Sequence, residues 1–152
     1  MAGVRADANH TSDHRLRIGS HHLAEMVEHV RHWYPLEGCG LLATVADVVV
    51  EVYPGTNVAY SETFYEMDPK EVLAATRDID EREIRLGAIF HSHPSTESYP
   101  SETDLGLIFD PEVYMIIISL AGAEPEVRAF RYDGDIHEVP IVIEDNPEGA
   151  AA

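Results

Sequence analysis

The chain has 152 residues, 45% of them hydrophobic, which is enough for the core of one globular domain. Ten basic against 28 acidic residues give a formal net charge of −18, so nucleic acid and anionic membrane surfaces are not expected as partners. The sequence has no apolar run of about 18 residues, the length that a membrane-spanning helix needs.

Two further features bear on location and surface. The single cysteine, Cys39, excludes an internal disulfide and fits a reducing compartment, and the polar N-terminus lacks the apolar stretch of a secretory signal. We therefore expect a cytoplasmic protein. The acidic residues can steer a basic partner or simply keep a salt-adapted surface hydrated, and their scatter along the chain favours the second interpretation.

The pattern predicts one domain over residues 15–144 between disordered tails at 1–14 and 145–152. Helical spacing predicts a first helix at 21–34, capped by Ser20. Asp68 followed by Pro69 predicts the start of a second helix, and Ser101 the start of a short third one. Extended segments are expected at 39–44, 48–53, 64–67, 86–91, 113–120, 127–132 and 136–143.

These elements predict an α+β domain. Segments 39–44 and 48–53 form a hairpin around Ala46-Asp47, and Asp133-Gly134 marks a second hairpin turn. Segment 113–120 is apolar on both faces, which indicates a central strand covered on each side. The expected architecture is a three-layer α-β-α domain with a mixed sheet.

The segment from His91 to Asp104 carries the clearest functional pattern. His91 and His93 lie two residues apart in an extended segment, so their side chains project from the same face. Pro94 ends that strand, and Ser101 and Asp104 share one face of the following helix, from which both can face the imidazoles. Two histidines, one carboxylate and a position open to water form a common catalytic zinc site.

Hydrolysis at such a metal site also needs a carboxylate that takes a proton from water and passes it to the leaving group. Glu37 is the candidate for this base. It follows the helix-ending Pro35 and precedes a strand, where its side chain can reach the end of a neighbouring strand.

These residues resemble the motifs of the JAMM, or MPN-plus, metalloprotease family. The resemblance covers about residues 15–143, and its motif positions are Glu37 with Cys39-Gly40-Leu41-Leu42, and His91-x-His93-Pro94 with Ser101-x-x-Asp104. It implies the cytidine-deaminase-like fold, a curved mixed sheet flanked by helices. It also implies one zinc ion held by His91, His93 and Asp104 with a water as fourth ligand, Glu37 as general base, and Ser101 as the group that stabilises the oxyanion.

The resemblance is closer to the short prokaryotic members than to the eukaryotic deubiquitinases, because the chain has little room for inserted segments. Phe64-Tyr65 and Tyr99-Pro100-Ser101 look similar to the bacterial enzymes. Those act on β-grasp sulfur-carrier proteins. The resemblance therefore implies a zinc metallopeptidase or isopeptidase that cuts at the C-terminal tail of a small ubiquitin-like or sulfur-carrier protein.

Several alternatives stay open at the level of sequence. The chain can instead be a non-catalytic MPN scaffold, or a metal-dependent amide hydrolase for a small molecule. Ser101 can serve first as a helix cap, and Cys39 is expected to be a buried, inert residue rather than a nucleophile. The oligomeric state, the leaving group, any regulator and the choice of zinc over another divalent ion are left undecided.

Overall fold

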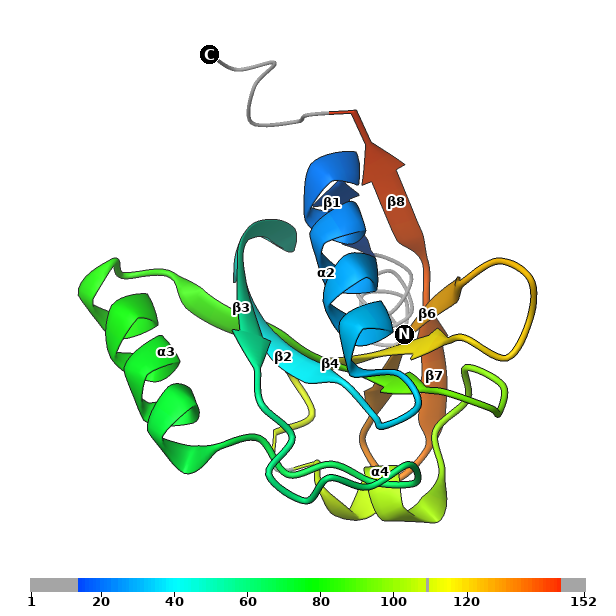
Figure 1. The fold of residues 1–152 in the computed structure, drawn as a ribbon. Helices are drawn as coiled ribbons and strands as arrows, with labels where there is room; N and C mark the ends of the chain where they lie inside the picture. The colour runs from blue at the N-terminus through cyan, green and yellow to red at the C-terminus, as the bar shows by residue number, and fades with distance from the viewer. Residues whose placement is uncertain (1–13, 109, 146–152) are drawn as a thin grey trace.

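The computed structural model describes residues 14–108 and 110–145 (Figure 1). The predicted tails fall almost wholly outside these residues, so the division of the chain into tails and domain stays a prediction. The elements in chain order are β1 (Leu16–Gly19), α2 (Ser20–Trp33), β2 (Cys39–Val45), β3 (Val48–Gly55), α3 (Pro69–Glu81), β4 (Arg85–His93), α4 (Glu102–Gly106), β5 (Tyr114–Ser119), β6 (Glu126–Tyr132), β7 (Ile136–Val139) and β8 (Ile141–Glu144).

All described strands belong to one mixed, curved sheet. Its order is β7-β6-β5-β4-β2-β3-β1-β8. The β4–β5, β1–β3 and β1–β8 pairs are parallel, and the remaining pairs are antiparallel. Strands β7 and β8 lie at opposite ends of this order, yet only Pro140 separates them in the chain. Because one residue spans only about 3.8 Å, the sheet must curl until its two edges come close together.

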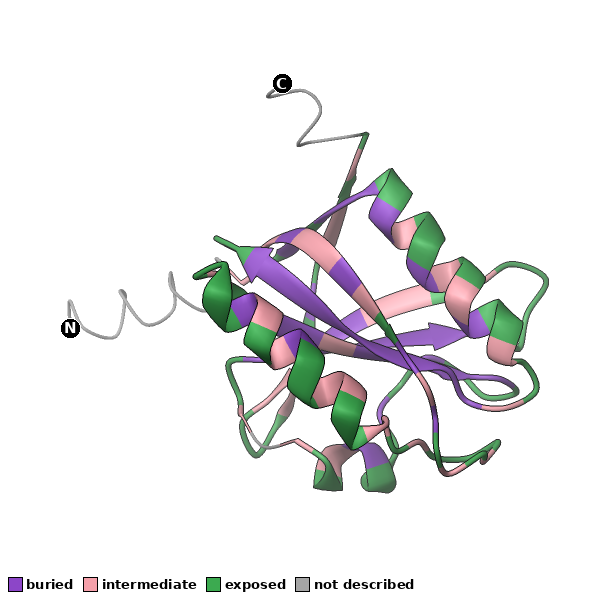
Figure 2. Cartoon of the chain, turned by 60° about the vertical axis from the view of Figure 1, so that its left-hand side comes forward, coloured by how far each residue is buried: buried purple, intermediate pink, exposed green. Residues whose placement is uncertain are grey.

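The helices cover both faces of the sheet, as the sequence predicts. On one face, Met26 and Val30 of α2 join the main core cluster with Leu42 and Phe90. On the other face, α3 packs on β2, β3 and β4, and the Tyr53 hydroxyl donates a hydrogen bond to Asp78 of this helix. Figure 2 shows that buried residues concentrate in the strands and on the inner sides of the helices. The three-layer α+β prediction is confirmed.

Local sequence explains one hairpin turn and the start of one helix. Ala46 and Asp47 both have positive φ (51° and 63°), the conformation of the tight turn that matches the twist of a two-stranded hairpin. At the start of α3, the Asp68 side chain accepts a hydrogen bond from the Lys70 N–H, and Pro69 occupies the first turn, where its missing N–H costs nothing. Both predictions are confirmed.

Other predictions were wrong or incomplete. Ser20 is the first residue of α2 and not its cap; the cap is Gly19, with no side-chain hydrogen bond. Segment 64–67 forms a single bridge between Asn57 and Met67 instead of a strand. Segment 136–143 is two strands, because Pro140 has no N–H to continue the ladder.

Strand β1 was not predicted. At four residues it is short, and it depends on pairing with β3 and β8, which are far away in the sequence. Among the described residues, no helix combines the length and apolar character that crossing a membrane requires.

Candidate metal centre

Strand β4 brings the two histidines to the sheet face that also carries α3. His91 and His93 alternate with Phe90 and Ser92, whose side chains are buried on the opposite face. The Phe90 ring packs in the main core, and the Ser92 hydroxyl accepts a hydrogen bond from the Gly38 N–H at 2.8 Å. These contacts fix the strand, so the two imidazoles point the same way.

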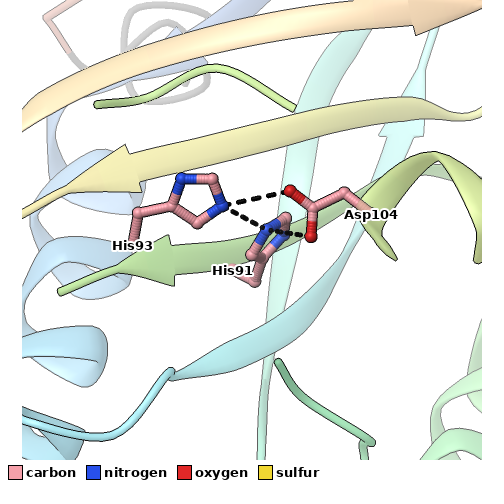
Figure 3. A group of neighbouring side chains, drawn as sticks. All are labelled: His91, His93 and Asp104. Atoms are coloured by element: carbon pink, nitrogen blue, oxygen red, sulfur yellow. Dashed lines mark hydrogen bonds and ion pairs between the residues drawn. The ribbon is translucent and has the colours of Figure 1, made fainter. Parts of the chain in front are cut away.

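Helix α4 supplies the third member of the cluster. Asp104 Oδ1 lies 3.1 Å from His91 Nε2, and its Oδ2 lies 3.0 Å from His93 Nε2 (Figure 3). The two Nε2 atoms are 3.3 Å apart. All three residues are buried, with exposed fractions of 1%, 5% and 3% for His91, His93 and Asp104. Their donor atoms converge within 4.8 Å, so one metal ion can contact all three.

A hydrogen bond outside the cluster orients His93. Its Nδ1 lies 2.7 Å from the Glu97 carbonyl and donates to it, which leaves Nε2 facing Asp104. A backbone carbonyl at the far nitrogen commonly fixes the tautomer of a metal-binding histidine. The predicted ligand set of His91, His93 and Asp104 is therefore brought together with the donor chemistry that a divalent ion needs, and the ligand role itself stays a prediction.

Burial and mutual contact shift the charges in this cluster. Burial lowers the pKa of His91, which keeps its imidazole neutral and able to bind a metal. Burial also opposes charge on His93 and Asp104. Nevertheless their mutual hydrogen bond raises the pKa of His93 above its ordinary value, and the bonds from both histidines hold the pKa of Asp104 well below its usual range.

Glu37 lies close enough to this cluster for the charges of His93 and Asp104 to act on its carboxyl. It is 3% exposed, and its Oε1 atom has no hydrogen-bond partner among the described residues. Burial raises the pKa of the Glu37 carboxyl to about 8, while the charge of His93 lowers it and that of Asp104 raises it. A buried carboxyl with a free oxygen and a pKa near neutrality has the properties of a general base. The base role remains a prediction.

Ser101 lies at the start of α4 and is exposed. Its hydroxyl accepts a hydrogen bond from the Asp104 N–H at 3.1 Å, and its own N–H donates to Asp104 Oδ2 at 2.9 Å. The alternative function as a helix cap is thus real. Because the hydroxyl uses only a lone pair in the cap, its proton can still be donated to another group. Capping and the predicted oxyanion role are therefore compatible.

Two residues near the centre were not assigned any contact from the sequence. The Tyr65 ring stacks on His91 with centroids 4.8 Å apart and planes inclined by 26°. Asn57 is fully buried and bonds to the backbone of Glu37. Nothing in the local sequence around Asn57 indicates that its hydrogen-bond partners lie 20 residues before it and nine after it.

Cys39 and a second acidic group do not take part in the candidate metal centre. Cys39 is fully buried, and burial together with nearby Glu71 and Glu37 raises the pKa of its thiol to about 12, as expected for an inert residue. A second group, made of Asp133, Asp135 and His137, lies at the β6–β7 turn. It is largely exposed, and Arg131 already pairs with Asp133.

The curved mixed sheet, its helical layers and the buried His-His-Asp group together define a domain of the JAB/MPN class. A family model described as prokaryotic homologs of the JAB domain matches residues 19–133. The chain belongs to this family, which confirms the resemblance seen in its motifs.

Two curated relatives are similar over most of their length. The chain is 36% identical over 120 residues to the CysO-cysteine peptidase of Mycobacterium tuberculosis, covering 76% of this chain and 82% of the relative. It is 31% identical over 114 residues to the desampylase of Haloferax volcanii, covering 72% and 80%.

Solved structures agree on the fold. A protein from Desulfitobacterium hafniense with 34% identity superposes with a TM-score of 0.80, covering 90% of this chain and 98% of that one. A JAB1/MPN domain protein from Archaeoglobus fulgidus with 23% identity gives a TM-score of 0.55, covering 84% and 98%.

Proposed function

We propose that this protein is a zinc-dependent metallopeptidase that hydrolyses a peptide or isopeptide bond at the C-terminal tail of a small ubiquitin-like or sulfur-carrier protein. The observation that carries this is the convergence of His91, His93 and Asp104 donor atoms beside the buried, unpartnered oxygen of Glu37. The names of two relatives, a CysO-cysteine peptidase and a desampylase, support the class of reaction and of substrate.

The proposed ion is zinc. Two imidazole nitrogens and one carboxylate are the ligands typical of a catalytic zinc site, while magnesium and calcium prefer sites made of oxygen. When bound, zinc polarises a scissile carbonyl and lowers the pKa of water.

The chain's own residues supply the proton transfers. In this mechanism the Glu37 carboxylate accepts a proton from the attacking water and later donates it to the nitrogen of the leaving amine. The Ser101 hydroxyl donates a hydrogen bond to the oxygen of the tetrahedral intermediate. The buried position of Glu37 keeps competing water from its carboxyl, so that the proton stays available for the amine.

Metal analysis and cleavage assays test the proposal together. The purified protein is expected to retain about one zinc per chain after dialysis. It should cleave synthetic tails in which Gly-Gly is joined either to cysteine or to a lysine side chain, and 1,10-phenanthroline should abolish both reactions. Asp104→Ala should lose both zinc and cleavage. Asp135→Ala, in the exposed second cluster, is the matched control and should keep both.

Each other outcome favours a rival. Zinc retention without cleavage of either tail favours the non-catalytic scaffold, and cleavage of small amides alone favours a small-molecule hydrolase. A wild-type protein that holds no metal, together with an Asp104→Ala variant of unchanged metal content and stability, would remove the peptidase proposal.

We also propose that the protein acts in the cytoplasm. Its Cys39 is a buried thiol, which is consistent with a reducing compartment. Fractionation of the source cells, with an antibody against the protein, should place it with cytoplasmic markers.

A further inference from the structure

Asn57 has an unusual set of contacts for a loop residue. Its side chain is fully buried in the segment between β3 and α3. The amide nitrogen donates to the Glu37 carbonyl at 3.0 Å and to the Phe64 carbonyl at 3.1 Å. The amide oxygen accepts from the Ala59 and Glu66 N–H groups, both at 3.0 Å. The two donors and two acceptor positions of the amide are therefore all in use.

Three of these bonds join the two segments that flank the candidate metal centre. One of them holds the backbone of Glu37, the proposed base. Two others hold Phe64 and Glu66, the neighbours of Tyr65 on each side, and the Tyr65 ring stacks on His91. A single buried side chain thus fixes both the base and the ring that covers a ligand.

Two further contacts connect the loop that contains Asn57 to Glu37 and to the helix before it. The Glu37 N–H donates to the Ser61 carbonyl at 2.9 Å, so the loop also holds Glu37 from its other backbone group. Tyr60 of this loop has a positive φ of 49° and packs its ring 6.2 Å from that of Trp33, four residues before Glu37. A left-handed conformation is costly for a bulky residue and persists only where the surrounding contacts impose it.

We propose that Asn57 is a positioning residue that fixes the Glu37 backbone and the Tyr65 ring relative to the metal centre. This inference rests on the proposed function for its effect on rate. It predicts that Asn57 affects the rate at which bound substrate reacts. Metal binding, by contrast, should depend on His91, His93 and Asp104.

The test compares Asn57→Asp with Thr56→Val. Aspartate has the shape of asparagine and keeps the acceptor for Ala59 and Glu66, but an ionised carboxylate cannot donate to Glu37 or Phe64. Thr56 lies next to it in the same loop and donates from its hydroxyl to Glu71 at 2.7 Å, and among the described residues it makes no hydrogen bond to Glu37. Thr56→Val therefore removes a loop hydrogen bond without touching the proposed base.

Activity is measured per zinc-loaded molecule on the Gly-Gly-cysteine tail. For Asn57→Asp, kcat should fall about 10- to 100-fold, with zinc content kept at one per chain and KM changed by less than about twofold. Thr56→Val should keep its kcat. Equal kcat values for the two variants, or a loss that parallels lost zinc, would overturn the proposal.

A second readout does not depend on catalysis. Trp33 is the one tryptophan of the chain, and it contacts Tyr60 of the loop. Asn57→Asp should increase acrylamide quenching of its fluorescence relative to wild type and Thr56→Val. If the wild-type protein does not cleave the tail, the proposed function fails. Unchanged acrylamide quenching in Asn57→Asp would separately overturn the positioning role of Asn57. Should Asn57→Asp not fold, Asn57→Ser is measured in the same way, and its failure to fold as well would show a purely structural role and overturn the proposal.

Discussion

At the scale of single residues, the centre combines groups that burial would ordinarily discourage. Asp104 is nearly inaccessible, yet hydrogen bonds from His91 and His93 keep it ionised. Glu37 is also buried, and the charge of His93 offsets that burial only in part, so the pKa of its carboxyl rises to about 8. Two nearby carboxyl groups with opposite pKa shifts can take different roles, one as an ionised ligand and the other as a proton carrier.

Replacing Glu37 with glutamine separates these roles. Glutamine has the same size but cannot accept the proton, so Glu37→Gln should lower kcat by about 10²- to 10⁴-fold while zinc content is retained. Cleavage of the Gly-Gly-cysteine tail and metal analysis measure the two effects. Glu62→Gln, at an exposed position of the neighbouring loop, should retain wild-type kcat. Near-normal cleavage by Glu37→Gln would show that another group is the base.

Cys39 should be inert toward thiol reagents in the folded protein. Its side chain is fully buried, and burial raises its thiol pKa to about 12, so the reactive thiolate is scarce at pH 8. Ellman's reagent should label about one thiol per chain in guanidinium chloride and almost none in native buffer. Rapid labelling of the native protein, or loss of cleavage in Cys39→Ser with normal folding, would contradict the prediction.

At the scale of elements, the short helix α4 links capping to the metal centre. It has five residues and depends on its capping box, in which Ser101 and Asp104 exchange hydrogen bonds. The same Asp104 Oδ2 that accepts from the Ser101 N–H also faces His93. The cap therefore orients a proposed metal ligand, and the sequence spacing that predicts the cap also predicts the ligand.

Two substitutions separate the cap from the proposed oxyanion contact. Ser101→Ala removes both, so it should lower the free energy of unfolding by about 1 kcal/mol and kcat by about 10²- to 10³-fold. Ser101→Asp keeps a good cap but cannot donate when ionised, so it should retain stability while kcat falls. Denaturant titration and cleavage assays measure these effects. Normal kcat in Ser101→Ala would leave Ser101 as a helix cap alone.

At the scale of the whole molecule, the net charge of −18 dominates the electrostatics. The ion pairs around the described surface are mostly exposed, among them Arg82 with Glu51 and Arg85 with Glu112. Exposed pairs contribute little to stability, whereas many like charges on one surface repel one another in the folded state.

Salt should therefore stabilise the protein. Raising NaCl from about 0.05 to about 0.5 M shortens the screening length and should raise Tm, because weakened repulsion outweighs weakened ion pairs. Differential scanning calorimetry measures the change, and sucrose of equal osmolality is the control for non-ionic effects. A lower Tm in NaCl would show that attractive surface pairs dominate.

Local sequence patterns predict the α+β fold class and bring forward the residues of the candidate metal centre, whose ligand role stays a prediction. The His91 and His93 spacing follows strand alternation, and the Ser101 and Asp104 spacing follows a helix turn, so both depend on neighbours in the chain. The strand order, the path from β7 to β8 across Pro140 and the contact of Asn57 with Glu37 become visible only in the folded structure. Such pairings depend on the packing of distant segments, which no local period or propensity encodes.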